Sequence, residues 1–272
     1  MSKFSVVIMK LTTTKPINQG TALVTGATMG IGAAIAERLA REGMDLVLVA
    51  RDGARLEAAA KRLRADHGVE VLAIPLDLSH EQASVQLAER LKDERVAVEV
   101  LVNNAGAAAV GSVADTDPAH MRTLIDLNAK AVAGLTSLLL PDMLVRGHGA
   151  IVNIASTAAY APAPYNAAYG AAKAFVLSFT RALWAETKGT GVRVVAVSPG
   201  ATETPMNTRP VPGKRQPEQV AETVIKALRG RGPAVVDGRF NTVQAFVFGR
   251  LLPSRTAARI TGQFFRKAAL ES

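Results

Sequence analysis

Seven short segments that are almost entirely apolar recur along the chain, and stretches with helical spacing separate them. The apolar segments are residues 21–25, 45–50, 70–75, 99–103, 150–155, 192–197 and 234–236. Such runs are typical of parallel strands that are covered on both faces. The first intervening stretch repeats Ile31, Ile35 and Leu39 at helical spacing and stops near Gly43. This alternation predicts an α/β fold with a doubly wound parallel sheet and right-handed crossovers.

The chain shows no repeat and no linker that would divide it. We therefore expect one domain over residues 20–272, after a polar, threonine-rich lead-in over residues 1–19. The glycine- and proline-rich stretch 199–217 is predicted to be a long loop within that domain, and loops of this length are usually functional. A C-terminal helical extension over residues 240–272 follows, with a break between two short helices at Pro253.

Composition excludes several kinds of site. The chain has no cysteine, which rules out disulfides and thiolate zinc sites, and its four histidines lack the spacing of metal ligands. The apolar stretch 135–145 is interrupted by Pro141 and Asp142, so we expect no membrane-spanning helix. The apolar run 4–9 is short for a signal peptide and ends at Lys10. We therefore expect a cytoplasmic protein without a metal.

A glycine-rich turn joins the first predicted strand to the first predicted helix. It reads TGATMGIG, from Thr25 to Gly32. Glycines at such a turn let the backbone approach a pyrophosphate, and the amides at the helix start point toward it. A purely structural turn is the alternative, but the position after the first strand of an α/β pattern favours dinucleotide binding.

The second predicted strand ends in Arg51, followed by Asp52. Dinucleotide-binding folds usually place here the residue that contacts the 2′ position of the ribose. An acidic residue would accept a hydrogen bond from a 2′-hydroxyl, whereas a guanidinium pairs with a 2′-phosphate. Arg51 therefore predicts a preference for NADP(H), with NAD(H) as the alternative cofactor and a solvated surface arginine as the alternative interpretation.

Tyr169 and Lys173 are four residues apart in a stretch predicted to be helical, which places them on one face. A nearby ammonium stabilises a phenolate and lowers the pKa of the phenol, which makes it a usable acid and base. A surface pair is the alternative. Ser156 follows the fifth predicted strand, and Asn128 lies 41 residues before Tyr169. Alone, these two could be a strand-end cap and a polar position within a helix.

Taken together, these motifs resemble those of the short-chain dehydrogenase/reductase family. Thr25 to Gly32 match its Thr-Gly-x-x-x-Gly-x-Gly motif, and residues 103–106 match its Asn-Asn-Ala-Gly motif. Its catalytic tetrad is matched by Asn128, Ser156, Tyr169 and Lys173. The resemblance covers about residues 19–236 and implies a Rossmann-type sheet of about seven strands. Two departures are Ala155 in place of a frequent serine and Met29 where NADP-preferring members often have a basic residue.

The resemblance also implies roles for the matched residues. Tyr169 would donate the proton in reduction, Lys173 would lower its pKa and contact the nicotinamide ribose, and Ser156 would bind the substrate oxygen. Asn128 would hold a water that relays protons. With Arg51, the predicted cofactor-binding residues are Gly26, Thr28, Met29, Gly30, Ile31, Gly32, Asp77, Leu78, Asn104, Ala105, Gly106, Tyr169, Lys173, Pro199, Gly200, Thr202 and Thr204.

Positive charge and phenylalanine are concentrated near the C-terminus. The chain has 32 Lys and Arg against 23 Asp and Glu, a net charge of +9. Residues 207–272 contain twelve of the basic residues and four of the acidic ones, so this segment carries +8 of that charge. Five of the eight phenylalanines lie in residues 240–265. Three hypotheses remain for this segment: an oligomer-interface or packing helix pair, a lid over an apolar substrate, and a membrane-surface contact. We favour docking beside the substrate cleft, because the loop from Thr202 leads toward the site; membrane contact is not favoured.

The sequence thus predicts an NADP(H)-dependent oxidoreductase that interconverts a carbonyl and a secondary alcohol on an apolar small molecule, in a homo-oligomer. A 3-oxoacyl thioester is the alternative substrate. A cofactor-binding redox sensor, or a basic binding protein with little turnover, is the alternative function. We expect no nucleic-acid partner, because no such motif is present and the basic residues are confined to one end.

Overall fold

The computed structural model describes residues 20–205, 207, 211 and 213–270, with side chains as far as Arg266. The predicted lead-in 1–19 lies outside the described residues. Seven strands form one parallel sheet in the order β3-β2-β1-β4-β5-β6-β7. They are β1 (Thr21–Thr25), β2 (Asp45–Ala50), β3 (Val71–Pro75), β4 (Val98–Asn103), β5 (Gly149–Ile154), β6 (Val192–Ser198) and β7 (Ala234–Val236). The predicted doubly wound parallel sheet is confirmed.

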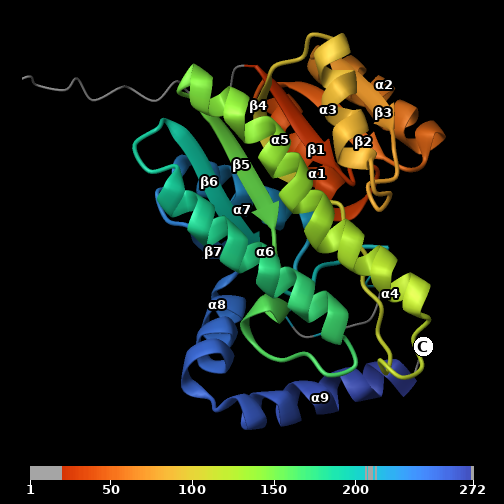
Figure 1. Cartoon of the computed structure of the whole chain (residues 1–272), viewed down its shortest axis with the longest axis vertical. Helices are drawn as coiled ribbons and strands as arrows, with labels where there is room; N and C mark the ends of the chain where they lie inside the picture. The colour runs from red at the N-terminus through yellow and green to blue at the C-terminus, as the bar shows by residue number, and fades with distance from the viewer. Residues whose placement is uncertain (1–19, 206, 208–210, 212, 271–272) are drawn as a thin grey trace, which may run out of the picture.

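Helices cover both faces of this sheet (Figure 1). They are α1 (Gly30–Arg41), α2 (Gly53–His67), α3 (Ala83–Asp93), α4 (Pro118–Ile125), α5 (Ala131–Arg146), α6 (Ala167–Glu186), α7 (Pro217–Arg229), α8 (Arg239–Phe246) and α9 (Ser254–Leu270). One core lies between the sheet and α1, α2 and α7, and includes Ile35 and Leu39 of the predicted α1 face. A second core lies on the opposite face under α3, α5 and α6, and includes Leu87 and Leu135.

The strand order reverses between β1 and β4. From β1 the chain proceeds to β2 and β3 on one side, then returns to β4 on the other side of β1. The carboxyl ends of parallel strands open into a crevice at such a point, which is where α/β proteins bind ligands. Thr25 and Asn104 connect the two strands there: the Thr25 hydroxyl accepts from the Asn104 amide at 2.9 Å, and Asn104 Nδ2 donates to the Thr25 carbonyl at 2.9 Å.

The stretch 135–145, whose apolar run Pro141 and Asp142 interrupt, lies within one helix. Pro141 lies inside α5, and helical structure continues from Pro118 to Arg146. Pro141 and Asp142 are exposed, so water can hydrate the carbonyl that loses its amide partner. By length and composition this stretch is the one candidate membrane span among the described residues, but α5 packs on α3, β4 and β5. We therefore assign it to the core layer of this fold.

The C-terminal helices lie beyond the carboxyl ends of the strands. In Figure 1, α9 runs across the end of the molecule toward which β5 points. A π-helical turn, Val247–Leu251, separates α8 from Pro253 and α9. The Thr261 hydroxyl of α9 donates to the Pro162 carbonyl at 2.7 Å, which ties α9 to the segment between β5 and α6.

Candidate active site

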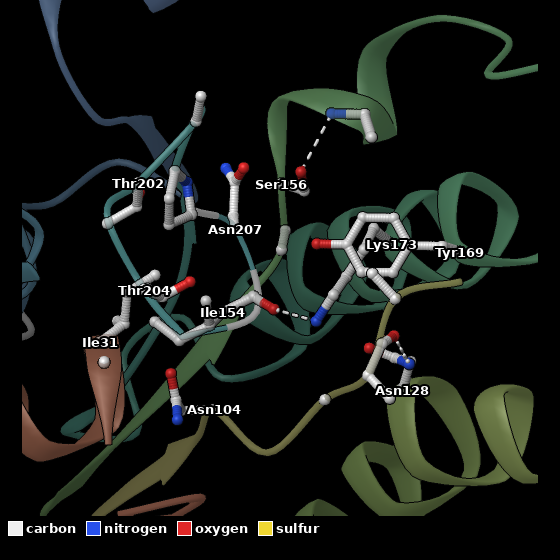
Figure 2. Close-up of a pocket in the computed structure, with 18 of the residues that line it drawn as sticks. Ile31, Asn104, Asn128, Ile154, Ser156, Tyr169, Lys173, Thr202, Thr204 and Asn207 are labelled. Atoms are coloured by element: carbon white, nitrogen blue, oxygen red, sulfur yellow. Dashed lines mark hydrogen bonds between the residues drawn. The ribbon is translucent and has the colours of Figure 1, made fainter. Parts of the chain in front are cut away.

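One cavity of about 1180 Å³ lies at the carboxyl edge of the sheet. It is lined by every residue that the sequence predicts for catalysis and cofactor binding. These are Gly26, Thr28, Met29, Gly30, Ile31, Gly32, Arg51, Asp77, Leu78, Asn104, Ala105, Gly106, Asn128, Ser156, Tyr169, Lys173, Pro199, Gly200, Thr202 and Thr204. Figure 2 shows part of this set, with side chains from different elements directed into one space. The fold thus brings together residues that are far apart in the sequence.

The glycine-rich turn leaves the start of α1 free for a ligand. Gly26 and Gly30 have φ angles of 67° and 56°, which disfavour other residues. A Cβ atom on Gly32 would collide with the Gly26 carbonyl. Met29 at the N-cap makes no side-chain hydrogen bond, and the first turn of α1 has no acidic residue. The backbone amides of this turn therefore have no side-chain partner from a cap and suit an anionic group such as a pyrophosphate.

At the end of β2 the cavity wall is basic. Arg51 is exposed there, and Arg55, one turn into α2, also lines the cavity. Asp52 is already engaged, since it accepts from the Arg55 amide at 3.0 Å and pairs with the Arg55 guanidinium at 3.2 Å. Its carboxylate therefore caps α2 and pairs with Arg55, and the exposed Arg51 guanidinium remains available to an anionic ligand.

Asp77 lies beside this basic end, after β3. Burial raises the pKa of its carboxyl, but the Ser79 amide and hydroxyl donate to Oδ1 at 2.9 and 2.8 Å, and the charge of Arg51 adds to their effect. The net result is a pKa below the usual value. Asp77 is thus held as a carboxylate, which can accept hydrogen bonds from a ligand.

Ser156 and Tyr169 come from two elements on the same side of the cavity. Ser156 follows β5, and its hydroxyl accepts from the Ala158 amide at 3.1 Å. Figure 2 shows the Tyr169 hydroxyl pointing into the pocket on the side of Ser156 and Lys173. Burial raises the pKa of the Tyr169 phenol, and the Ser156 hydroxyl partly offsets this. The phenol is therefore protonated at neutral pH, whereas the sequence predicts a lowered pKa.

Lys173 lies beside this phenol and is also buried. Its ammonium is buried, donates to the Ile154 carbonyl at 2.9 Å and lies 5.7 Å from the centre of the Tyr169 ring. Burial lowers the pKa of Lys173 to about 8. Burial thus disfavours the charged form of both groups, and burial is what holds the pKa of the phenol above its usual value.

Asn128 occupies a π-helical turn, Asp126–Lys130, between α4 and α5. Its Nδ2 donates to the carbonyls of Leu124 and Ala107 at 2.9 and 2.8 Å. Its Oδ1 is buried and has no partner among the described residues. A Cβ on Gly106 would come within 2.7 Å of this oxygen and 3.5 Å of Lys173 Nζ, so the glycine leaves room for both groups. An unpaired acceptor beside an ammonium is a site that a water can fill.

Residues 20–214 match the short chain dehydrogenase family, over most of the chain and all of the motifs described above. The chain belongs to the short-chain dehydrogenase family. As a member of this family it is an oxidoreductase, and the resemblance seen in its sequence is confirmed.

Relatives and solved structures agree with this assignment. Sulfoacetaldehyde reductase 2 of Chromohalobacter salexigens is 42% identical over 184 residues, which are 67% of this chain and 72% of that protein. A short-chain dehydrogenase from Sphingobium yanoikuyae, solved in complex with NADPH, is 34% identical with a TM-score of 0.75, over 93% of this chain and 95% of that one. The bulky-bulky ketone specific alcohol dehydrogenase from Comamonas testosteroni is 30% identical with a TM-score of 0.74, over 89% of this chain and 98% of that one.

The part of this short-chain dehydrogenase that the family match does not cover forms the far wall of the cavity. Phe240 and Phe248 come from α8 and the turn after it, and Ile260, Phe264 and Phe265 come from α9. Asn241, Gln244 and Thr261 also line the cavity from α8 and α9. Among the described residues, the cations that line the cavity are Arg51, Arg55 and Lys173, and none of them is on this far wall. The cavity is thus charged and polar at one end, and mainly apolar with a few neutral polar groups at the other.

The sequence patterns do not predict Arg55 or the individual residues of the apolar wall. Arg55 lies in the first turn of α2, four residues after Arg51, and the nearness of a second arginine is the signal that could have indicated another basic contact. The phenylalanines stand out as a group in the sequence, but helical spacing alone does not show which of them face the cavity. No group of His, Asp and Glu residues that could hold a metal occurs in the described part of the chain.

Proposed function

We propose that this protein is an NADP(H)-dependent oxidoreductase that interconverts a ketone and a secondary alcohol on an apolar, uncharged small molecule, with Tyr169 as acid and base. The observation that carries the proposal is the shape and lining of one cavity. Its polar end joins the glycine-rich turn to Ser156, Tyr169 and Lys173, and its other end is mainly apolar and holds no described cation.

The residues present fit a dinucleotide. The uncapped start of α1 suits its pyrophosphate, and Asp77 and Leu78 line the wall where an adenine would lie. Arg51 and Arg55 suit a 2′-phosphate, which supports NADP(H) over NAD(H). The NADPH complex of the Sphingobium relative adds support by similarity. When bound, the dinucleotide supplies or accepts the hydride.

The chain's own residues would manage the substrate oxygen and its proton. The Ser156 hydroxyl would donate a hydrogen bond to the ketone oxygen, where negative charge develops. The Tyr169 phenol, held protonated by burial, would transfer its proton to that oxygen during reduction. Lys173, fixed on the Ile154 carbonyl, would orient the phenol and the ribose. A water on Asn128 Oδ1 would return a proton to the site through Lys173.

The mainly apolar far wall supports a bulky, uncharged substrate. The sulfonate that the Chromohalobacter relative is named for would need a cation near the reacting carbon, and the far wall offers none among its described residues. Bulky ketones, named for the Comamonas relative, match an aromatic wall better.

Initial rates of NADPH consumption test this proposal. The panel would contain bulky aryl and alicyclic ketones, acetone, sulfoacetaldehyde and a 3-oxoacyl thioester. We expect kcat/KM to be highest for the bulky neutral ketones and to fall strongly in Tyr169→Phe. Highest activity on sulfoacetaldehyde would contradict the substrate class, and highest activity on the thioester would favour that alternative. NADPH binding with no turnover of any carbonyl would favour a redox sensor.

A further inference from the structure

Two buried side-chain oxygens have no hydrogen-bond partner among the described residues, Asn128 Oδ1 and Asn166 Oδ1. Both asparagines line the cavity. Buried polar atoms are nearly always paired in folded proteins, and an exception at a cavity marks a place where a ligand or water completes the pairing. Asn128 has a role in proton transfer in the proposed function, whereas Asn166 has none.

Asn166 is placed where a helix-capping residue normally sits, but it does not cap. It occupies the N-cap position of α6 and makes no side-chain hydrogen bond to that helix. Its backbone is satisfied, since its amide donates to the Ala163 carbonyl at 3.0 Å and its carbonyl accepts from the Gly170 amide at 2.9 Å. The side chain is only 6% exposed. An asparagine at an N-cap normally accepts from the first turn, so this side chain forgoes a stabilising bond.

The backbone beside Asn166 is strained. Tyr165 has a φ of 62°, one of two described non-glycine residues with a positive φ. Its carbonyl accepts from the Gly111 amide at 2.7 Å, which holds this conformation against the loop after β4. Strain of this kind persists at sites that bind or react with ligands. Tyr165 and its hydrogen bond from Gly111 therefore hold the backbone that leads into Asn166 in one conformation.

Asn166 also lies close to the reacting groups. It is the N-cap residue of α6, three residues before Tyr169, and both side chains line the same cavity. Ala161, Pro162 and Ala163 also line the cavity, and they offer no side-chain hydrogen bond. Asn166 is thus a buried polar group between these apolar residues and the helix that carries the phenol.

We propose that Asn166 is a hydrogen-bonding subsite for a hydroxyl group of the substrate, close to the carbonyl that Tyr169 protonates. An amide accepts at one end and donates at the other, and a hydroxyl does both, so the two groups match in either orientation. The substrate class is then a bulky, otherwise apolar hydroxyketone, or the corresponding diol in oxidation. This inference rests on the proposed function and assigns the substrate's second polar group.

Matched ketone pairs test the subsite. Acetophenone is compared with 2-hydroxyacetophenone, and 4-phenyl-2-butanone with 4-hydroxy-4-phenyl-2-butanone, in wild-type protein and in Asn166→Leu. We expect the wild type to prefer the hydroxylated member of at least one pair by about tenfold or more in kcat/KM, and the variant to lose that preference. The readout is the ratio of kcat/KM within each pair, so a general change in activity is not mistaken for loss of the preference. No preference in the wild type, or one that survives in Asn166→Leu, would overturn the subsite.

Thermal unfolding tests it without turnover. If the amide is kept for a ligand, Asn166→Leu removes an unpaired buried polar group and raises Tm by a few degrees. A lowered Tm would show that the amide serves the fold, and would overturn the proposal. Gln263→Leu makes a similar exchange on the exposed side of α9, away from the cavity, and should change neither Tm nor the substrate ratio. If the wild type reduces no ketone, the proposed function is contradicted. The Tm of Asn166→Leu relative to wild type still decides, in that case, whether the Asn166 amide stabilises the fold.

Discussion

Arg215 and Asp237 form a two-pronged ion pair beneath the C-terminal wall of the cavity. Arg215 Nε lies 2.9 Å from Asp237 Oδ2, and Nη2 lies 3.0 Å from Oδ1. Asp237 is fully buried and also accepts from the Thr223 hydroxyl of α7. The pair joins the loop after β6 to the residue that precedes Gly238 and α8. It therefore holds two walls of the cavity in one position.

Removing Arg215 should destabilise the protein. Arg215→Met leaves the buried Asp237 carboxylate without its cation, and breaking a buried pair in this way costs about 3–5 kcal/mol. We expect Tm to fall by roughly 10 °C in thermal unfolding. Adding Asp237→Leu to Arg215→Met should recover part of the loss, because no unpaired charge remains. A Tm for Arg215→Met within two or three degrees of wild type would contradict this role.

Tyr169→Phe should remove the transferable proton and leave the cavity intact. Loss of one general acid reduces kcat by about 10²- to 10⁴-fold. The affinity for NADPH, measured by fluorescence titration, should change little. If the variant kept more than about a tenth of wild-type kcat on a bulky ketone, another group would have to supply the proton.

The ionisation of Tyr169 also predicts the pH dependence of each direction. Because burial raises the pKa of the phenol, the acid needed for reduction is present at neutral pH, and kcat/KM for reduction should be level there and fall at alkaline pH. Oxidation needs the phenolate, so its kcat/KM should rise with pH over the same alkaline range. Parallel profiles for the two directions would argue against a shared acid and base.

Lys173 should make stability depend on pH. Its pKa is about 8 in the folded protein and near 10.4 in an unfolded chain. Between these values the unfolded chain holds a proton that the folded protein has released, so the free energy of unfolding increases as pH rises. Below pH 8 the buried charge costs about 3 kcal/mol. The difference in unfolding free energy between wild type and Lys173→Met, from urea denaturation, should therefore shift in favour of the wild type between pH 8 and pH 10. A pH-independent difference would exclude this shifted pKa.

Arg51 and Arg55 should determine the cofactor preference. Each charged hydrogen bond to a 2′-phosphate contributes about 1.5–3 kcal/mol, or roughly 10- to 100-fold in affinity. Arg51→Ala should therefore weaken NADPH binding by at least tenfold and leave NADH binding unchanged, and Arg51→Ala with Arg55→Ala should abolish the preference. Lys61→Ala, an exposed change on α2 outside the cavity, is the control. Equal affinity of the wild type for NADH and NADPH would contradict this role of the arginines.

The strands and the motif residues could be predicted because their signals are local. An apolar run such as 192–197 corresponds to β6 almost to the residue, since a strand covered on both faces needs apolar side chains throughout. The continuation of α5 through Pro141 could not be predicted, because a proline's effect on a helix depends on whether water can reach the freed carbonyl, and that depends on tertiary placement. The conformation of Tyr165 beside Asn166 likewise depends on a hydrogen bond from the Gly111 amide, in the loop after β4.

The C-terminal segment shows the same limit, and α9 offers the sharpest test of its function. Ile260 and Phe264 are 44% and 57% exposed and line the cavity, whereas Phe246, 56% exposed on α8, does not.

If α9 is the wall that contacts substrate, Phe264→Ala should raise KM for bulky apolar ketones by about tenfold, since burying a phenylalanine contributes about 1.5–3 kcal/mol. The KM for acetone and the affinity for NADPH should not change. Phe246→Ala is the matched control for the other hypotheses. If Phe264→Ala leaves substrate selectivity unaltered, the substrate wall is contradicted. Loss of oligomers by Phe246→Ala in sedimentation would then favour an interface, and loss of its binding to anionic vesicles would favour a membrane contact.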